Sequence, residues 1–151
     1  MFILVAAIII ASISIYYAKQ NIEPKQGFEI YLFDEDGNQI EKYPELSRLA
    51  TLRDVEGVQS VRIDYFIQSN KPIDYELGVI RIHRDIEKYF SGFYIPYNGT
   101  LSGSVKIYSI RIPDVESLLS NKIFIEQSLK YRFNPGDEWI TDEVMYSVYV
   151  K

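Results

Sequence analysis

Val61-Arg62-Ile63-Asp64-Tyr65-Phe66-Ile67-Gln68 is the stretch that decides the fold class of this chain. Its odd-numbered residues are apolar or aromatic, whereas positions 62, 64 and 68 carry polar side chains. Successive side chains of a β-strand point to opposite faces, so this period of two predicts a strand with one buried and one solvated face.

A second strand is predicted just before it, at Phe28-Glu29-Ile30-Tyr31-Leu32-Phe33. The turn cluster Asp34-Glu35-Asp36-Gly37-Asn38 follows, and its composition favours a tight hairpin into Gln39-Ile40-Glu41. A calcium loop is the alternative, because Asp34, Asp36 and Asn38 have the spacing of the first ligands and Glu45 stands at position twelve. That loop requires glycine at the sixth position, which is Gln39 here, so we expect the hairpin turn.

Further strands are predicted along the rest of the chain, with a turn cluster between each pair. Seven or so strands at intervals of about ten residues favour an antiparallel β-sandwich of immunoglobulin-like kind, with Trp139 as a core residue. The remaining predicted strands lie at 75–83 and 101–112 and in a closing hairpin of 122–133 with 139–150. Turns or loops are predicted at 69–72, 94–100 and 134–137. Helical turns are predicted at 43–53 and 115–120, and either a helical turn or a crossover at 85–90.

The first seventeen residues contrast with this body, because they contain no charged side chain and are almost wholly aliphatic. Continued through Gln20 as an α-helix, the segment reaches about 30 Å, the thickness of a bilayer core. Three interpretations remain open: a cleaved secretory signal, a single membrane anchor, and the packing helix of a filament subunit. No basic residue precedes the apolar run, which disfavours the signal peptide.

An apolar N-terminal segment followed by a β-rich body resembles archaeal type IV pilins and archaellins. The segment here is Met1-Phe2-Ile3-Leu4-Val5-Ala6-Ala7-Ile8-Ile9-Ile10-Ala11-Ser12-Ile13-Ser14-Ile15-Tyr16-Tyr17. In that family such a helix is kept on the mature subunit and packs in the filament core. The spacing of Ala7 and Ala11 would let neighbouring helices approach closely. The resemblance implies a hydrophobic helix over 1–20, a hinge over 21–27 and a β-sandwich head over 28–151, with helix packing by Phe2, Leu4, Ala7, Ile8, Ala11 and Ile15.

Composition excludes several classes of function. The chain has 151 residues and a net charge of -5 with no basic stripe, which argues against binding to nucleic acid. It has no cysteine, so disulfides and thiolate metal sites are excluded. The one histidine, His83, has no partner ligands nearby in the sequence, and no nucleophile or nucleotide-binding motif occurs. We therefore expect no enzyme activity, no cofactor, no bound metal and no small-molecule substrate.

Two kinds of surface site are predicted in the body. Asn98-Gly99-Thr100 fits the N-glycosylation acceptor motif and falls in a predicted loop. The chain has 13 tyrosines, and Tyr94, Tyr97 and Tyr108 are the predicted surface contacts because tyrosine is enriched at interfaces. Each also has a plainer interpretation, as a turn asparagine or as a half-buried strand residue.

Together these observations favour a structural subunit of an extracellular, pilus-like filament at the cell surface. Such a subunit would reside in the membrane before assembly and would self-associate into a homopolymer through its N-terminal helices. The alternative is a single-pass, membrane-anchored accessory or adhesion protein whose extracytoplasmic β domain binds a larger surface assembly.

Overall fold

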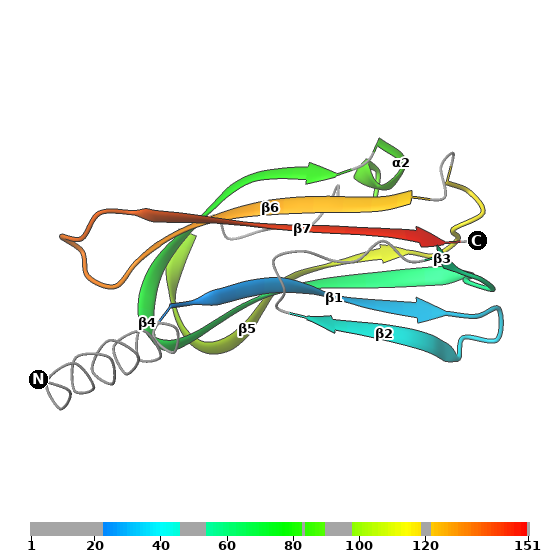
Figure 1. Cartoon of the computed structure of the whole chain (residues 1–151), viewed down its shortest axis with the longest axis horizontal. Coiled ribbons are helices and arrows are strands. Elements are labelled where there is room, and N and C mark those ends of the chain that lie inside the picture. The colour runs from blue at the N-terminus through cyan, green and yellow to red at the C-terminus, as the bar shows by residue number, and fades with distance from the viewer. Residues whose placement is uncertain (1–22, 46–53, 83, 90–97, 119–121, 151) are drawn as a thin grey trace, which may run out of the picture.

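The computed structural model describes residues 23–45, 54–82, 84–89, 98–118 and 122–150 (Figure 1). The predicted helix over 1–20, with its six packing residues, lies outside these ranges, as do residues 46–53 of the predicted helical turns. The elements are β1 (Lys25–Phe33), β2 (Gln39–Glu45), β3 (Asp54–Val55), β4 (Ser60–Ile82), α2 (Arg84–Glu87), β5 (Asn98–Ile112), β6 (Lys122–Arg132) and β7 (Ile140–Val150).

All of these strands belong to one seven-stranded sheet with the order β2-β1-β4-β6-β7-β3, and β5 pairs with β4. The pairings are antiparallel except for the two-residue match of β3 with β7. The predicted fold class, an N-terminal helix followed by an immunoglobulin-like sandwich of two sheets, is therefore wrong. The described residues form one continuous sheet, and their only helix is the four-residue α2.

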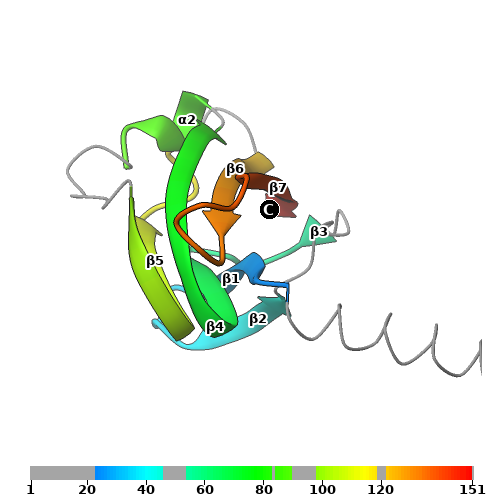
Figure 2. The same cartoon turned by 90° about the vertical axis from the view of Figure 1, so that its left-hand side faces the viewer.

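The 23-residue strand β4 explains how one sheet encloses a core. Residues 60–68 of β4 pair with β1 and residues 74–82 pair with β6, while β5 follows β4 along the other side. We call β2, β1 and the adjoining parts of β4 and β5 the first half of the sheet, and the remainder the second half. Figures 1 and 2 show β4 curving, so that β6 and β7 come to lie beside β1.

The curve is located where β4 and β5 both lose regular register, between Ser69 and Ile73 on β4. Opposite this point Gly103 has a φ of +79°, which residues with a Cβ adopt only at a cost. The Ser69 hydroxyl donates a hydrogen bond of 2.7 Å to the Lys71 carbonyl and holds the irregular segment in place. The predicted turn at 69–72 is thus a bend within one strand, and Pro72 is tolerated there because a bulge needs no N–H from it.

The predicted alternation of residues 61–68 is confirmed. Val61, Ile63, Tyr65 and Ile67 are at most 2% exposed, and they form one core with apolar residues of both halves. The core residues on the other strands include Phe28, Ile30 and Leu32 of β1, Tyr108, Ile110 and Ile112 of β5, Ile123, Ile125 and Leu129 of β6, and Val144 and Tyr146 of β7. Burial of these side chains supplies the main drive for folding.

The predicted β1–β2 hairpin is confirmed, with a turn held by the Asp34 carboxylate. Its Oδ1 accepts hydrogen bonds from the backbone N–H groups of Asp36, at 3.0 Å, and Asn38, at 2.7 Å. This is the self-capping for which aspartate is favoured in turns. β1 begins at Lys25, so the predicted hinge over 21–27 overlaps the sheet, where Gln26 is only 2% exposed.

The closing β6–β7 hairpin is also confirmed, and its turn is held by hydrogen bonds between Asn134 and Asp137. The prediction for Trp139 is wrong. The ring is 41% exposed and packs against the Arg132 guanidinium, 4.6 Å from the ring centroid, because it lies beyond the end of β6 where no second layer covers it.

Two shorter predictions have different outcomes. The segment near residue 85 is a helical turn, α2, and its Ile86 is fully buried. The predicted helix at 115–120 is, in its described part, a turn. Asp114 caps that turn by accepting a hydrogen bond of 2.9 Å from the Glu116 N–H.

Candidate functional site

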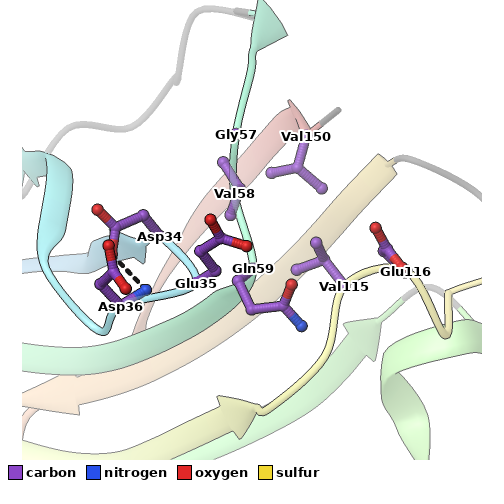
Figure 3. Close-up of a pocket in the computed structure, with 9 residues that line it drawn as sticks. All are labelled: Asp34, Glu35, Asp36, Gly57, Val58, Gln59, Val115, Glu116 and Val150. Atoms are coloured by element: carbon purple, nitrogen blue, oxygen red, sulfur yellow. Dashed lines mark hydrogen bonds between the residues drawn. The ribbon is translucent and has the colours of Figure 1, made fainter.

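An acidic pocket of about 480 Å³ opens at the end of the sheet where β1 ends and β7 ends (Figure 3). The β1–β2 turn contributes Asp34, Glu35 and Asp36, and the segment after β5 contributes Glu116. The Asp34 carboxylate is already engaged by the backbone of its own turn. Among the described residues, no group of three or more histidine, cysteine, aspartate or glutamate side chains is placed to hold a metal ion.

On the outer face of the first half of the sheet, a row of three cationic residues and one tyrosine crosses four strands. Lys42 of β2 is opposite Tyr31 of β1, Tyr31 is opposite Arg62 of β4, and Arg62 is opposite Arg111 of β5. We call these four residues the cation row. The Tyr31 ring has the Lys42 ammonium 4.9 Å from its centroid and the Arg62 guanidinium 4.1 Å from it. Each contact is a favourable cation–π interaction.

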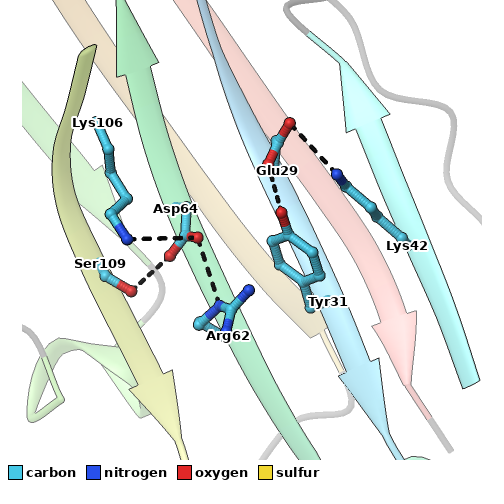
Figure 4. Close-up of polar contacts among 7 residues, drawn as sticks. All are labelled: Glu29, Tyr31, Lys42, Arg62, Asp64, Lys106 and Ser109. Atoms are coloured by element: carbon cyan, nitrogen blue, oxygen red, sulfur yellow. Dashed lines mark hydrogen bonds and ion pairs between the residues drawn. The ribbon is translucent and has the colours of Figure 1, made fainter. Parts of the chain in front are cut away.

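Two carboxylates form the next row of the same face and hold the cations in place (Figure 4). Glu29 lies 3.5 Å from Lys42 and accepts a hydrogen bond from the Tyr31 hydroxyl. Asp64 is 3% exposed; its Oδ2 lies 3.4 Å from the Arg62 Nε, and its Oδ1 accepts a hydrogen bond from Ser109. This buried carboxylate forms an ion pair with Arg62, although the Arg62 Nε makes no hydrogen bond.

Arg111, at the end of the cation row, is exposed and makes no hydrogen bond or ion pair with another described residue. Like charges directly opposite each other on neighbouring strands repel. Asp64 compensates the charge of Arg62, whereas Arg111 has no carboxylate partner among the described residues, so an anion beside Arg111 would be favourable. The two arginines line a pocket of about 350 Å³ together with apolar residues that include Phe33 and Pro113. We call it the arginine pocket.

The sequence does not predict that Arg62 and Arg111 are neighbours. The alternation places Arg62 on the polar face of its strand, and Arg111 lies 49 positions further along the chain. Only the register between β4 and β5 brings them together, and no sequence pattern gives that register.

Buried polar side chains join the two halves of the sheet. Gln26 of β1 accepts a hydrogen bond of 2.7 Å from the Tyr65 hydroxyl and donates one of 3.2 Å to Asp142 of β7. Burial raises the pKa of Tyr65 well above its usual value, and the nearby Asp142 charge raises it further. Burial also raises the pKa of Tyr108, whose ring stacks on that of Tyr65 at 5.0 Å.

The acceptor motif at Asn98 lies at the start of β5 and not in the predicted loop. Asn98 is opposite Glu76 of β4, and its side chain is exposed. The Thr100 hydroxyl donates a hydrogen bond of 2.9 Å to the Asp74 carboxylate. The asparagine therefore remains accessible, although its strand is paired on one side.

The predicted tyrosine contacts are only partly described. Tyr108 is 5% exposed, so the prediction that it is a surface contact is wrong; it lies on the inward face of β5. Tyr94 and Tyr97 lie outside the described residues, as does His83.

No protein-family model matches the chain, and no curated protein matches it. Among the described residues, no helix is long enough and apolar enough to cross a membrane.

Proposed function

We propose that this chain is a structural subunit of an extracellular filament. In this proposal the apolar N-terminal segments reside in the membrane before assembly and then pack together in the filament core, while the β domains form the outer surface. Packing in such a core depends on close contact between apolar side chains, because lipid and neighbouring subunits are equally apolar.

The observation that carries the proposal is the position of β1. Seven residues separate Tyr17, the last residue of the charge-free segment, from Lys25, the first residue of β1. β1 lies inside the sheet, with nine residue pairs to β4 on one side and six to β2 on the other. A load that reaches β1 along the chain is therefore shared by two ladders of hydrogen bonds. An edge strand would have one ladder, and a subunit under tension needs the stronger attachment.

The proposal is tested by shearing cells that produce the full chain and by measuring the protein in the released filaments and in the membranes. A filament subunit is abundant in the sheared fraction and forms visible filaments. Retention of the protein in the membrane at low copy would contradict the proposal and would favour a membrane-anchored accessory protein. Mass analysis of the native N-terminus adds an independent readout, because removal of a leader or methylation of the terminus is expected for a pilin-like subunit.

A further inference from the structure

The tip of the β6–β7 hairpin and the arginine pocket are at opposite ends of the described domain. The tip consists of residues 134–140, and β7 runs from it to Val150, which lines the acidic pocket beside the β1–β2 turn. Eleven strand residues at ~3.4 Å each separate the two ends by roughly 35 Å. Figure 1 shows the tip at the left and the β1–β2 turn at the right.

The tip presents an acidic group next to apolar side chains. Glu138 is exposed and makes no hydrogen bond or ion pair with another described residue. Trp139 and Ile140 follow it and are 41% and 47% exposed. The Arg132 guanidinium lies over the Trp139 ring and is itself paired with Asp74 at 3.2 Å. The tryptophan is thus held in position while much of its surface faces solvent.

The arginine pocket has the complementary chemistry. The guanidinium groups of Arg62 and Arg111 supply positive charge, and Phe33 and Pro113 supply apolar surface. A carboxylate between two arginines would accept charge-assisted hydrogen bonds and would relieve their mutual repulsion. The residues that line the arginine pocket include no aspartate or glutamate, because the acidic side chains of the adjacent β1–β2 turn line the separate acidic pocket.

We propose that the β6–β7 tip of one copy of this chain docks into the arginine pocket of the next, with Glu138 between Arg62 and Arg111 and Trp139 against the apolar wall. This inference rests on the proposed filament function and names the contact between successive β domains. Tryptophan and arginine are the residue types that most often dominate binding energy at protein interfaces. Because the two surfaces are different and lie at opposite ends, the contact does not close on itself, and repetition extends it into a fibre.

Disulfide trapping tests the contact, because the chain has no cysteine of its own. Pro113 lines the pocket and Pro135 lies in the tip, and both are exposed. In full-length protein carrying Pro113→Cys and Pro135→Cys, a mild oxidant should produce a ladder of covalent multimers. The two cysteines of one chain cannot bridge, because a disulfide needs Cα atoms within about 7 Å.

Charge reversal then identifies the residues responsible. In the double-cysteine chain, Arg111→Glu or Glu138→Lys should each abolish the ladder, and the two changes together should restore it in part. Lys130→Glu, at an exposed position on β6, makes the same charge change as Arg111→Glu and should leave the ladder intact. Circular dichroism confirms that each variant keeps its sheet. If the proline variants unfold, Ser60→Cys and Gly136→Cys replace them.

Three results would overturn the inference: no ladder, a ladder indifferent to the Arg111 and Glu138 changes, or dimers formed by either single-cysteine chain alone. The last result would indicate a symmetric contact. The outcome is separable from that of the proposed function. Sheared filaments whose subunits give no ladder contradict this contact alone, whereas a ladder from protein that forms no filaments in cells contradicts the filament proposal alone.

Discussion

The Tyr108 hydroxyl donates a hydrogen bond of 3.1 Å to Oε1 of Gln127, and this bond joins β5 in the first half of the sheet to β6 in the second. Both residues are at most 5% exposed. The Gln127 amide nitrogen donates in turn to the carbonyls of Gly78 and Ser128. The contact therefore connects three strands across the core.

Removal of this hydroxyl tests its contribution to stability. Tyr108→Phe keeps the ring and its stacking on Tyr65 but leaves a buried acceptor without this donor, so we expect a loss of about 1–3 kcal/mol in the free energy of unfolding, measured with urea. Tyr89→Phe is the matched control, because its hydroxyl bonds to Ser117 at an exposed site and its loss should cost about 0.5 kcal/mol or less. Equal losses in the two variants would contradict a special role for Tyr108.

The bend in β4 and β5 depends on a residue with positive φ. Gly103→Ala places a Cβ on a backbone with a φ of +79°, so we expect a loss of about 1–2 kcal/mol, measured as a lower urea midpoint. Gly136→Ala is the control. Its φ is not in the positive region, and an added Cβ would meet no atom within 4 Å, so its stability should change little. A destabilised Gly136 variant beside an unaffected Gly103 variant would show that the bend is not set by this backbone angle.

The buried tyrosines make stability depend on alkaline pH. Burial raises the pKa of Tyr65 and of Tyr108 above 10.0 in the folded protein, whereas in the unfolded chain both phenols ionise near that value. Above pH 10 the unfolded state therefore binds fewer protons than the folded state, and the free energy of unfolding falls as the pH rises. Below pH 10 this contribution is fully present.

Two measurements check this pH dependence. The near-ultraviolet absorbance of phenolate should show tyrosines that ionise only as the protein unfolds, and the alkaline fall in stability should be shallower in Tyr108→Phe. An identical slope in the variant and the parent chain would contradict the assignment.

The acceptor motif at the start of β5 gives a prediction about modification. If the protein is exported in a cell that attaches N-linked glycans, we expect one glycan on Asn98, whose side chain is exposed. Asn98→Gln and Thr100→Ala should each remove the added mass in intact-protein mass spectrometry, whereas Thr100→Ser keeps the motif and should retain it. A mass that is unchanged by Asn98→Gln would exclude this site.

The sequence predicts the local elements of this fold well, because period-two alternation and turn chemistry are local properties. The alternation of Val61 to Ile67 and the Asp34 turn both follow from residues a few positions apart. Pro72 misled the prediction, since a proline after Asn70 and Lys71 usually indicates a turn between strands and not a bulge within one.

What the sequence could not predict depends on contacts between distant residues. The two arginines of the pocket are opposite each other only through the β4–β5 register, and Tyr108 is buried only because the second half of the sheet covers it. The prediction for Trp139 failed in the opposite direction. Its size predicts burial, but its place beyond the end of β6 leaves it exposed to solvent. Register and layer packing are set by the whole chain and leave no short motif.

The continuity of β4 through both halves has a consequence for how the domain comes apart. Neither half of the sheet is complete without the other, because both halves share β4 and one core. Cutting the chain near residue 70 would remove a shared ladder of backbone hydrogen bonds and half of the core from each half. The domain should therefore melt in one cooperative step, with no stable fragment that survives on its own.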